Sequence, residues 1–171
     1  MTHDQKVVAT GAVCGVTAMI VALVVLYSLW PLPVGLATAS DRLVYVVQAN
    51  AIAVLPLLIA VTVVGNNRFL SEAIDSTLNK ENLATLINGR VADNTLQQYV
   101  LFVAATFALS VNLPPDQMRI VPAAVVVFVV ARFAFWVGYR IAPLYRAFGM
   151  AATAYLNVGL LGYAFWQMLA R

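Results

Sequence analysis

The chain has 171 residues, of which 63% are hydrophobic and only 10% are charged, and its net charge is +3. Soluble globular domains carry about 25% charged residues, so this composition excludes an ordinary soluble domain and indicates a membrane protein. The basic residues are scattered singly, without the basic run typical of nucleic-acid binding. The single cysteine, Cys14, cannot form an intramolecular disulfide, and no metal-ligand set stands out, so we expect no metal.

Five charge-poor runs approach the roughly 20 apolar residues that a helix needs to cross a bilayer. They predict spanning helices at about Lys6–Trp30, Leu43–Val64, Gly89–Leu113, Met118–Tyr139 and Pro143–Leu169. The first run is too long for a signal-peptide core and ends at Pro31 without a small-residue cleavage site, so we expect a retained anchor. The predicted fold class is an all-α integral membrane protein.

Two interruptions of this pattern predict local structure. Pro56 lies inside the second run and is expected to kink its helix. The long polar segment Asn66–Gly89 is expected to form short amphipathic helices at the membrane surface, with Ser71 and Asn82 as caps. This segment is either a solvated connector or a cover over a ligand site.

A polar face opens the third predicted helix. Arg90, Asn94, Gln97 and Gln98 follow at i, i+4, i+7 and i+8, which is one face of an α-helix. Polar groups are costly in hydrocarbon, so this face is expected to look into the bundle or toward a polar ligand. The alternative is hydrogen bonding between helices, with Arg90 extending to the lipid headgroups.

The fourth predicted helix carries an arginine inside an apolar run. Arg132, Phe135 and Tyr139 share one helical face at i, i+3 and i+7. An intramembrane arginine is a functional candidate by default, although Arg132 could also reach the headgroups or pair with Asp93.

The basic residues also predict an orientation. With five helices, the N-terminus, the Asn66–Gly89 loop and the turn after Tyr139 lie on one side of the membrane, and most basic residues lie there. Only Arg42, Arg119 and Arg171 fall on the other side. The positive-inside rule then places the N-terminus in the cytoplasm and the C-terminus outside. A prokaryotic inner membrane is the expected location, with the endoplasmic reticulum as the alternative.

Two segments resemble a known family. The spacing R-x-x-x-N-x-x-[E/Q] at Arg90, Asn94 and Gln97 resembles the glutathione-contacting signature of the MAPEG family, the membrane-associated proteins of eicosanoid and glutathione metabolism, such as microsomal glutathione transferases. Ala131–Gly149 is similar to the family's later R-x-x-[FY]-x-x-G-Y segment with its following A-P-L-Y. The resemblance covers residues 41–171 and implies a four-helix membrane domain there. Residues 1–40 would form an extra transmembrane helix, an arrangement that resembles the family's mattrin-like branch.

The resemblance implies a function and a set of site residues. Family members are homotrimers that bind glutathione between subunits, so Arg90, Asn94, Gln97, Arg132 and Tyr139 would hold glutathione. Arg140 or Arg146 would stabilise the thiolate, which is the nucleophilic form of a thiol. The protein would conjugate glutathione to lipophilic electrophiles, or use it to reduce hydroperoxides, with membrane lipid delivering the substrate. The sequence departs from the family pattern at Gln97, where many members have Glu, and at Phe135, where some have Tyr.

Two other functions compete with a membrane glutathione transferase or peroxidase. The first is a non-enzymatic membrane scaffold or regulatory protein with the same fold, which the two departures favour. The second is a small transporter or channel subunit, which the lack of acidic residues in the apolar runs and of internal repeats disfavours.

Overall fold

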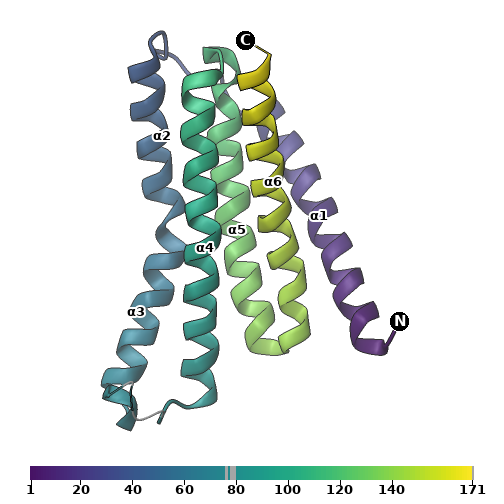
Figure 1. The fold of residues 1–171 in the computed structure, drawn as a ribbon, viewed down its shortest axis with the longest axis vertical. Helices are drawn as coiled ribbons and strands as arrows, with labels where there is room; N and C mark the ends of the chain where they lie inside the picture. Colours follow the sequence, from purple (N-terminus) through teal and green to yellow (C-terminus); the bar gives the residue numbers. More distant parts are fainter. Residues whose placement is uncertain (76, 78–79, 171) are drawn as a thin grey trace.

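The computed structural model describes residues 1–75, 77 and 80–170, which fold into long helices that run up and down the molecule (Figure 1). The α-helices are α1 (His3–Leu29), α2 (Ala39–Ala53), α3 (Leu55–Phe69), α4 (Leu83–Asn112), α5 (Ile120–Ile141) and α6 (Ala147–Leu169). Short 3-10 helices occupy three of the links: η1 (Glu72–Ile74), η3 (Pro115–Arg119) and η4 (Pro143–Arg146). The predicted all-α fold is therefore confirmed.

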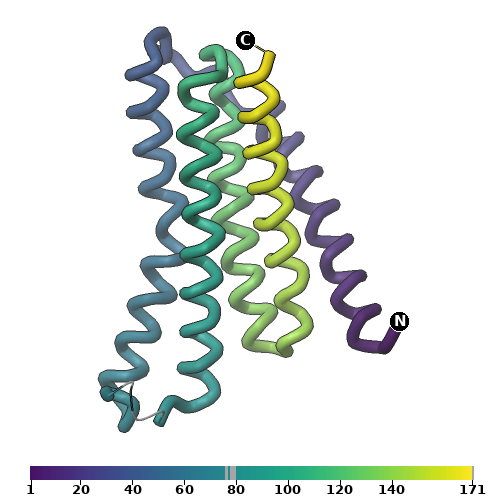
Figure 2. The backbone as a smooth tube through the Cα atoms, viewed as in Figure 1, coloured from purple at the N-terminus to yellow at the C-terminus, as the bar shows by residue number. Residues whose placement is uncertain are grey.

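The chain alternates in direction along the bundle. The N-terminus, the link from α3 to α4 and the turn from α5 to α6 lie at one end, and the C-terminus lies at the other (Figure 2). This is the alternation that the sequence predicted, although the side of the membrane that each end faces stays a prediction. Arg171, which entered the charge count, lies outside the described residues.

Within the described residues, four segments are long and apolar enough to cross a membrane: His3–Leu29, Ala39–Phe69, Pro115–Ile141 and Pro143–Leu169. The α4 helix has 30 residues and lies beside the others, but it is not among the four. Each of the five predicted spans therefore corresponds to a long helical segment of the bundle. The α4 segment is more polar than a typical span, because it carries many amide and hydroxyl side chains. A central, polar helix of this kind must direct those groups toward protein or water.

Helix ends follow from local sequence. The second span breaks at Val54 because Pro56 has no N–H to continue the helix, which confirms the kink. The α4 helix begins at Leu83, earlier than the predicted Gly89, since Asn82 caps it: the Asn82 side-chain oxygen accepts a hydrogen bond from the Thr85 N–H at 2.9 Å. The Ser71 hydroxyl caps η1 in the same way, so both predicted caps are confirmed.

The first helix lies at one side of the others, against α6 and α5 (Figure 1). Gly11 and Gly15 are one turn apart and face the start of α6, and a Cβ atom at Gly15 would collide with the Phe148 carbonyl group. Small residues at this spacing let two membrane helices approach closely. The glycine pair therefore fixes where α1 crosses α6. The predicted boundary at residue 40, between the extra helix and the four-helix domain, stays a prediction.

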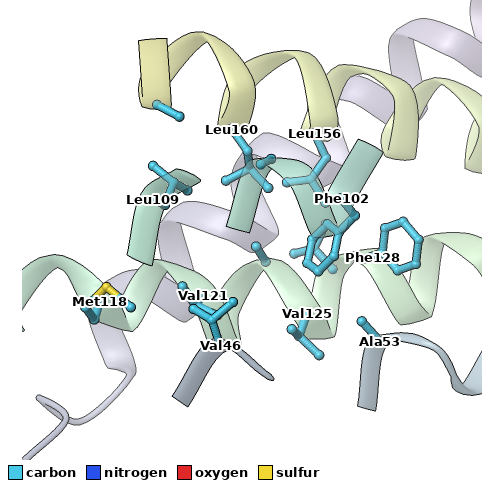
Figure 3. Packing of buried hydrophobic residues seen from close by; sticks show 14 of the residues in the cluster. Val46, Ala53, Phe102, Leu109, Met118, Val121, Val125, Phe128, Leu156 and Leu160 are labelled. Atoms are coloured by element: carbon cyan, nitrogen blue, oxygen red, sulfur yellow. The ribbon is translucent and has the colours of Figure 1, made fainter. Parts of the chain in front are cut away.

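The interior has two apolar clusters. The larger one joins α2, α4, α5 and α6 and is centred on Phe102 and Phe128, whose ring centroids are 4.6 Å apart (Figure 3). The smaller one contains Val91, Phe135 and Tyr139. Along α4, α5 and α6 the residues between these clusters form what we call the buried polar layer: Thr95, Gln98, Arg132, Thr153 and Asn157. The buried part of the candidate functional site lies in this layer.

Candidate functional site

The buried polar layer is built around Arg132, whose side chain is only 1% exposed. Its guanidinium donates to the Thr153 hydroxyl on α6, and to the Asn94 side-chain oxygen and the Thr95 hydroxyl on α4, each at 3.0 Å. The Nε atom is buried without a partner among the described residues. All three partners are neutral, so Arg132 is held in place without having its charge balanced.

A second set of hydrogen bonds in the layer ties α6 to α4. The Asn157 amide donates to the Gln98 backbone oxygen at 3.0 Å and to the Gln98 side-chain oxygen at 2.9 Å. Both residues are almost fully buried. The layer therefore holds α4, α5 and α6 together at one level of the bundle.

Aromatic rings link Arg132 to two more arginines nearer the end of the bundle. The Arg132 guanidinium lies 4.2 Å from the Phe135 ring centroid, and the Phe135 ring packs edge-on against Tyr139 at 5.9 Å. The Tyr139 hydroxyl accepts a long hydrogen bond of 3.4 Å from Arg90, and the Arg146 guanidinium lies 4.7 Å from the Tyr139 ring centroid. We call these five residues the arginine–aromatic cluster.

Two glycines bring the parts of the cluster together. A Cβ atom at Gly149 would clash with the backbone of α5 at Phe135 and would lie 2.5 Å from the Ala131 carbonyl oxygen. A Cβ atom at Gly138 would lie 2.7 Å from the Tyr145 carbonyl oxygen. Only glycine permits these approaches, which fold η4 back against α5 and so place Arg146 over Tyr139.

The cluster has no acidic counterpart among the described residues. The ion pairs formed by those residues are Arg68–Glu81 at 2.6 Å and Lys80–Glu72 at 3.4 Å, both between α3, the following loop and the start of α4. With the described residues, Arg90, Arg132 and Arg146 make no such pair. Cationic groups gathered without carboxylates attract an anion, most strongly where the surroundings are of low dielectric constant.

The structure brings together most of the residues that the sequence singled out. Arg90, Asn94, Arg132, Tyr139 and Arg146 all belong to one connected set of contacts. Arg90 and Arg146 are exposed at the end of the bundle, whereas Arg132 and Tyr139 are buried.

Two predicted residues lie elsewhere. Gln97 is exposed on α4, because the inward face of that helix runs through Val91, Thr95 and Gln98 instead. Of the predicted polar face, Gln98 is therefore turned into the bundle of the single chain, whereas Gln97 is not. Arg140 is also exposed, and it lines a separate hollow beside α3 and the start of α4.

The expected environment of Arg132 also needs correction. The alternatives to a functional role for Arg132 were contact with the lipid headgroups or a pair with Asp93. The structure buries Arg132 within a single chain, since threonines on both neighbouring helices supply acceptors. Thr95 and Thr153 were not predicted, because no local sequence signal marks them as acceptors for Arg132. Arg132 pairs with Asn94, and not with Asp93 as one alternative held.

These features define a class: an integral, multi-pass, all-α membrane protein with a cationic site at one end of its bundle. The chain is 23% identical to Transmembrane protein 79 of Bos taurus over 133 residues, which are 78% of this chain and 33% of that protein. It is 24% identical to Transmembrane protein 79 of Mus musculus over 118 residues, or 69% of this chain and 30% of that protein. The chain thus spans about a third of the length of the curated relatives that it matches.

The comparisons overturn the family resemblance. No family model matches the chain, and no solved structure matches it. The relatives named above are called transmembrane proteins and not glutathione-metabolising enzymes. The assignment to the MAPEG family is therefore wrong. Any function of the site must be argued from its own geometry.

Proposed function

We propose that this membrane protein binds glutathione at the arginine–aromatic cluster. The observation that carries the proposal is the grouping of three arginines around two aromatic rings with no carboxylate partner among the described residues. A ligand that fits there is an anion with more than one negative charge. Peptide groups in the ligand would also find a partner, since the Asn94 amide is hydrogen-bonded to Arg132 of the cluster.

Glutathione satisfies these requirements group by group. Arg90 and Arg146 lie on either side of Tyr139 and are exposed, so each can form a charge-assisted hydrogen bond with one carboxylate. The oxygen of the half-buried Asn94 side chain already accepts from Arg132, which orients the amide nitrogen as a donor to a peptide carbonyl. Arg132 then serves to position Asn94 and to add positive potential from behind.

The same groups support thiol chemistry. A guanidinium beside a thiol favours its thiolate form, and the Arg146 guanidinium together with the Tyr139 hydroxyl can provide that environment. The thiolate sulfur would bond to an electrophilic carbon of a lipophilic substrate, whose leaving group departs with the electron pair. With a hydroperoxide, two glutathione molecules would be oxidised to their disulfide while the peroxide becomes alcohol and water. Arg146 replaces Arg140 as the favoured residue because only Arg146 contacts the cluster.

Assembly as a homotrimer belongs to the same proposal. Gln97 lies near the middle of α4 and is exposed on the outside of the single chain. A polar side chain facing lipid at that depth is costly unless protein or water covers it. Packing of α4 against a second copy would cover Gln97 and would enclose the neighbouring cluster.

Calorimetric titration of glutathione into the purified protein in neutral detergent tests the proposal. Arg90→Ala and Arg146→Gln should each weaken binding about ten- to hundred-fold, the equivalent of one charge-assisted hydrogen bond. Arg119→Gln, which removes an arginine at the other end of the bundle, is the matched control and should bind as the wild type does. Turnover with a chloro-nitroaromatic electrophile then tests catalysis. A wild-type protein that binds no glutathione refutes the proposal.

A membrane scaffold is the second candidate, and one observation favours it. The three hydrogen bonds of Arg132 all end on side chains of its own bundle, which is what structural hydrogen bonding between helices requires. In that case the cluster variants would lower the thermal stability of the protein, and glutathione would bind to none of them.

A further inference from the structure

A second polar site lies on another side of the same end of the bundle, between the end of α3 and the start of α4. It is a hollow of about 360 Å³ that Arg140 at the end of α5 completes. Its described lining is mainly polar: Asn67, Ser71, Asn82, Asn88 and Arg140, with Val63 and Leu70 as an apolar wall. None of these residues belongs to the arginine–aromatic cluster.

One amide that lines the hollow belongs to a buried residue, Asn88, and its NH₂ group has no acceptor among the described residues. Asn88 is 2% exposed, and its side-chain oxygen accepts a hydrogen bond of 2.9 Å from the Trp136 indole N–H. That bond fixes the orientation of the amide, so the NH₂ group is turned away from Trp136. No acceptor among the described residues takes its hydrogens, and Asn88 lines the hollow. The Asn88 amide nitrogen is therefore a donor that a ligand in the hollow can engage.

The charge balance of the hollow points to an anionic acceptor. Arg140 makes no ion pair within the described part of the chain, where the ion pairs join Arg68 with Glu81 and Lys80 with Glu72. The hollow also lies at the N-terminus of the 30-residue helix α4, where helix N–H groups favour negative charge. Guanidinium, amide donors and a helix N-terminus together suit a tetrahedral oxyanion such as phosphate.

We propose that this hollow binds a phosphate group, carried by an anionic phospholipid headgroup or by a soluble phosphate ester. Arg140 and the Asn88 amide hold the phosphate oxygens, and Asn67 and Asn82 donate from the rim. The apolar wall of Val63 and Leu70 lies against the glycerol part of the ligand. Bound there, the ligand joins α3, α4 and α5 at their common end.

The test uses two probes with the full-length protein in neutral detergent. Dioleoyl phosphatidylglycerol and glycerol 3-phosphate are titrated separately, and the bound fraction is read by native mass spectrometry. Arg140→Gln should weaken binding about ten-fold or more, because it removes the only cation in the described lining. Lys6→Gln, the same charge change at an exposed residue of the same end, should leave binding unchanged.

The two probes separate the sources of the phosphate. Binding of phosphatidylglycerol alone identifies a lipid headgroup site, whereas equal binding of glycerol 3-phosphate identifies a site for a soluble phosphate ester. Either result supports the proposal if Arg140→Gln weakens the binding. Arg90→Ala should bind phosphatidylglycerol normally, so this site and the proposed glutathione site succeed or fail separately. No binding of either probe to the wild type, or equal weakening by Arg140→Gln and Lys6→Gln, would overturn the proposal.

Discussion

Replacing Arg132 by methionine tests whether the arginine contributes mainly to the stability of the bundle or to ligand binding. Methionine is flexible, has a similar length and can fill the space that the arginine side chain occupies. It removes the positive charge and the three hydrogen bonds to Asn94, Thr95 and Thr153. We expect the free energy of unfolding of Arg132→Met to lie within about 1 kcal/mol of the wild-type value, because opposing terms nearly cancel.

The magnitudes come from the contacts of Arg132. Hydrogen bonds between membrane helices contribute about 0.6 kcal/mol each on average, so the three bonds supply about 2 kcal/mol. The contact with the Phe135 ring at 4.2 Å adds up to about 2 kcal/mol where water is excluded. Against these gains stands the cost of a charge inside the membrane, about 2.5–3.5 kcal/mol on insertion scales. The Thr153 hydroxyl keeps its own bond to the Gly149 carbonyl in the variant, so one of the three partners stays hydrogen-bonded.

The protein is unfolded with SDS in mixed micelles, and the loss of helix is measured by circular dichroism. Glutathione binding to the same samples is measured by calorimetry. Arg132→Ala is the matched variant: it leaves a cavity, and should lose about 2–5 kcal/mol. If the cluster binds an anion, Arg132→Met keeps its stability and binds glutathione more weakly, since Asn94 is no longer oriented. A loss of stability in Arg132→Met as large as that in Arg132→Ala would refute the reasoning and make Arg132 a structural clamp.

Three further substitutions test the packing. Gly149→Ala places a methyl group against the backbone of α5 and should cost about 1–3 kcal/mol in the same unfolding assay, whereas Gly159→Ala, with nothing within 4 Å of its Cβ position, should not destabilise the protein. Gly15→Leu should separate α1 from α6 and expose α1 to protease while the other helices stay intact; unchanged protection would contradict the close crossing. Thr106→Val removes the hydroxyl that accepts a 2.9 Å hydrogen bond from the buried Asn50 amide on α2, and should lower the free energy of unfolding by about 0.6–1.7 kcal/mol. Thr62→Val, on an exposed face, should change it by almost nothing. Equal losses in the two variants would argue against the bond to Asn50.

Much of the fold could be predicted because membrane helices obey strong local rules. Runs without charge located every pass of the chain, Pro56 located the break in the second span, and Asn82 was recognised as a cap. The start of α4 was misplaced because the polar segment Asn66–Gly89 was expected to lie outside the spanning helix. A membrane helix can continue into water where a cap satisfies its first N–H groups, and Asn82 does this beyond the apolar run.

The site was harder to predict, since spacing alone does not show which edge of a helical face turns inward. Gln97 and Gln98 are adjacent in sequence, so they point about 100° apart on a helix of 3.6 residues per turn. The predicted face included both, but packing of α6 against α4 selected Gln98, which meets Asn157. Partners on other helices, such as Thr95 and Thr153 around Arg132, depend on tertiary packing and left no local signal.

The arrangement separates the residues that hold the bundle from those that are free to bind. Arg132 and Asn157 are buried in bonds that join α4, α5 and α6, so neither can move without breaking contacts between helices. Arg90 and Arg146 are exposed, and their contacts with Tyr139 are a long hydrogen bond and a ring contact, which are individually weak. Both can turn toward an incoming anion at little cost to the fold. Ligand affinity should therefore respond to changes at Arg90 and Arg146, and the rigidity of the site to changes in the buried polar layer beneath them.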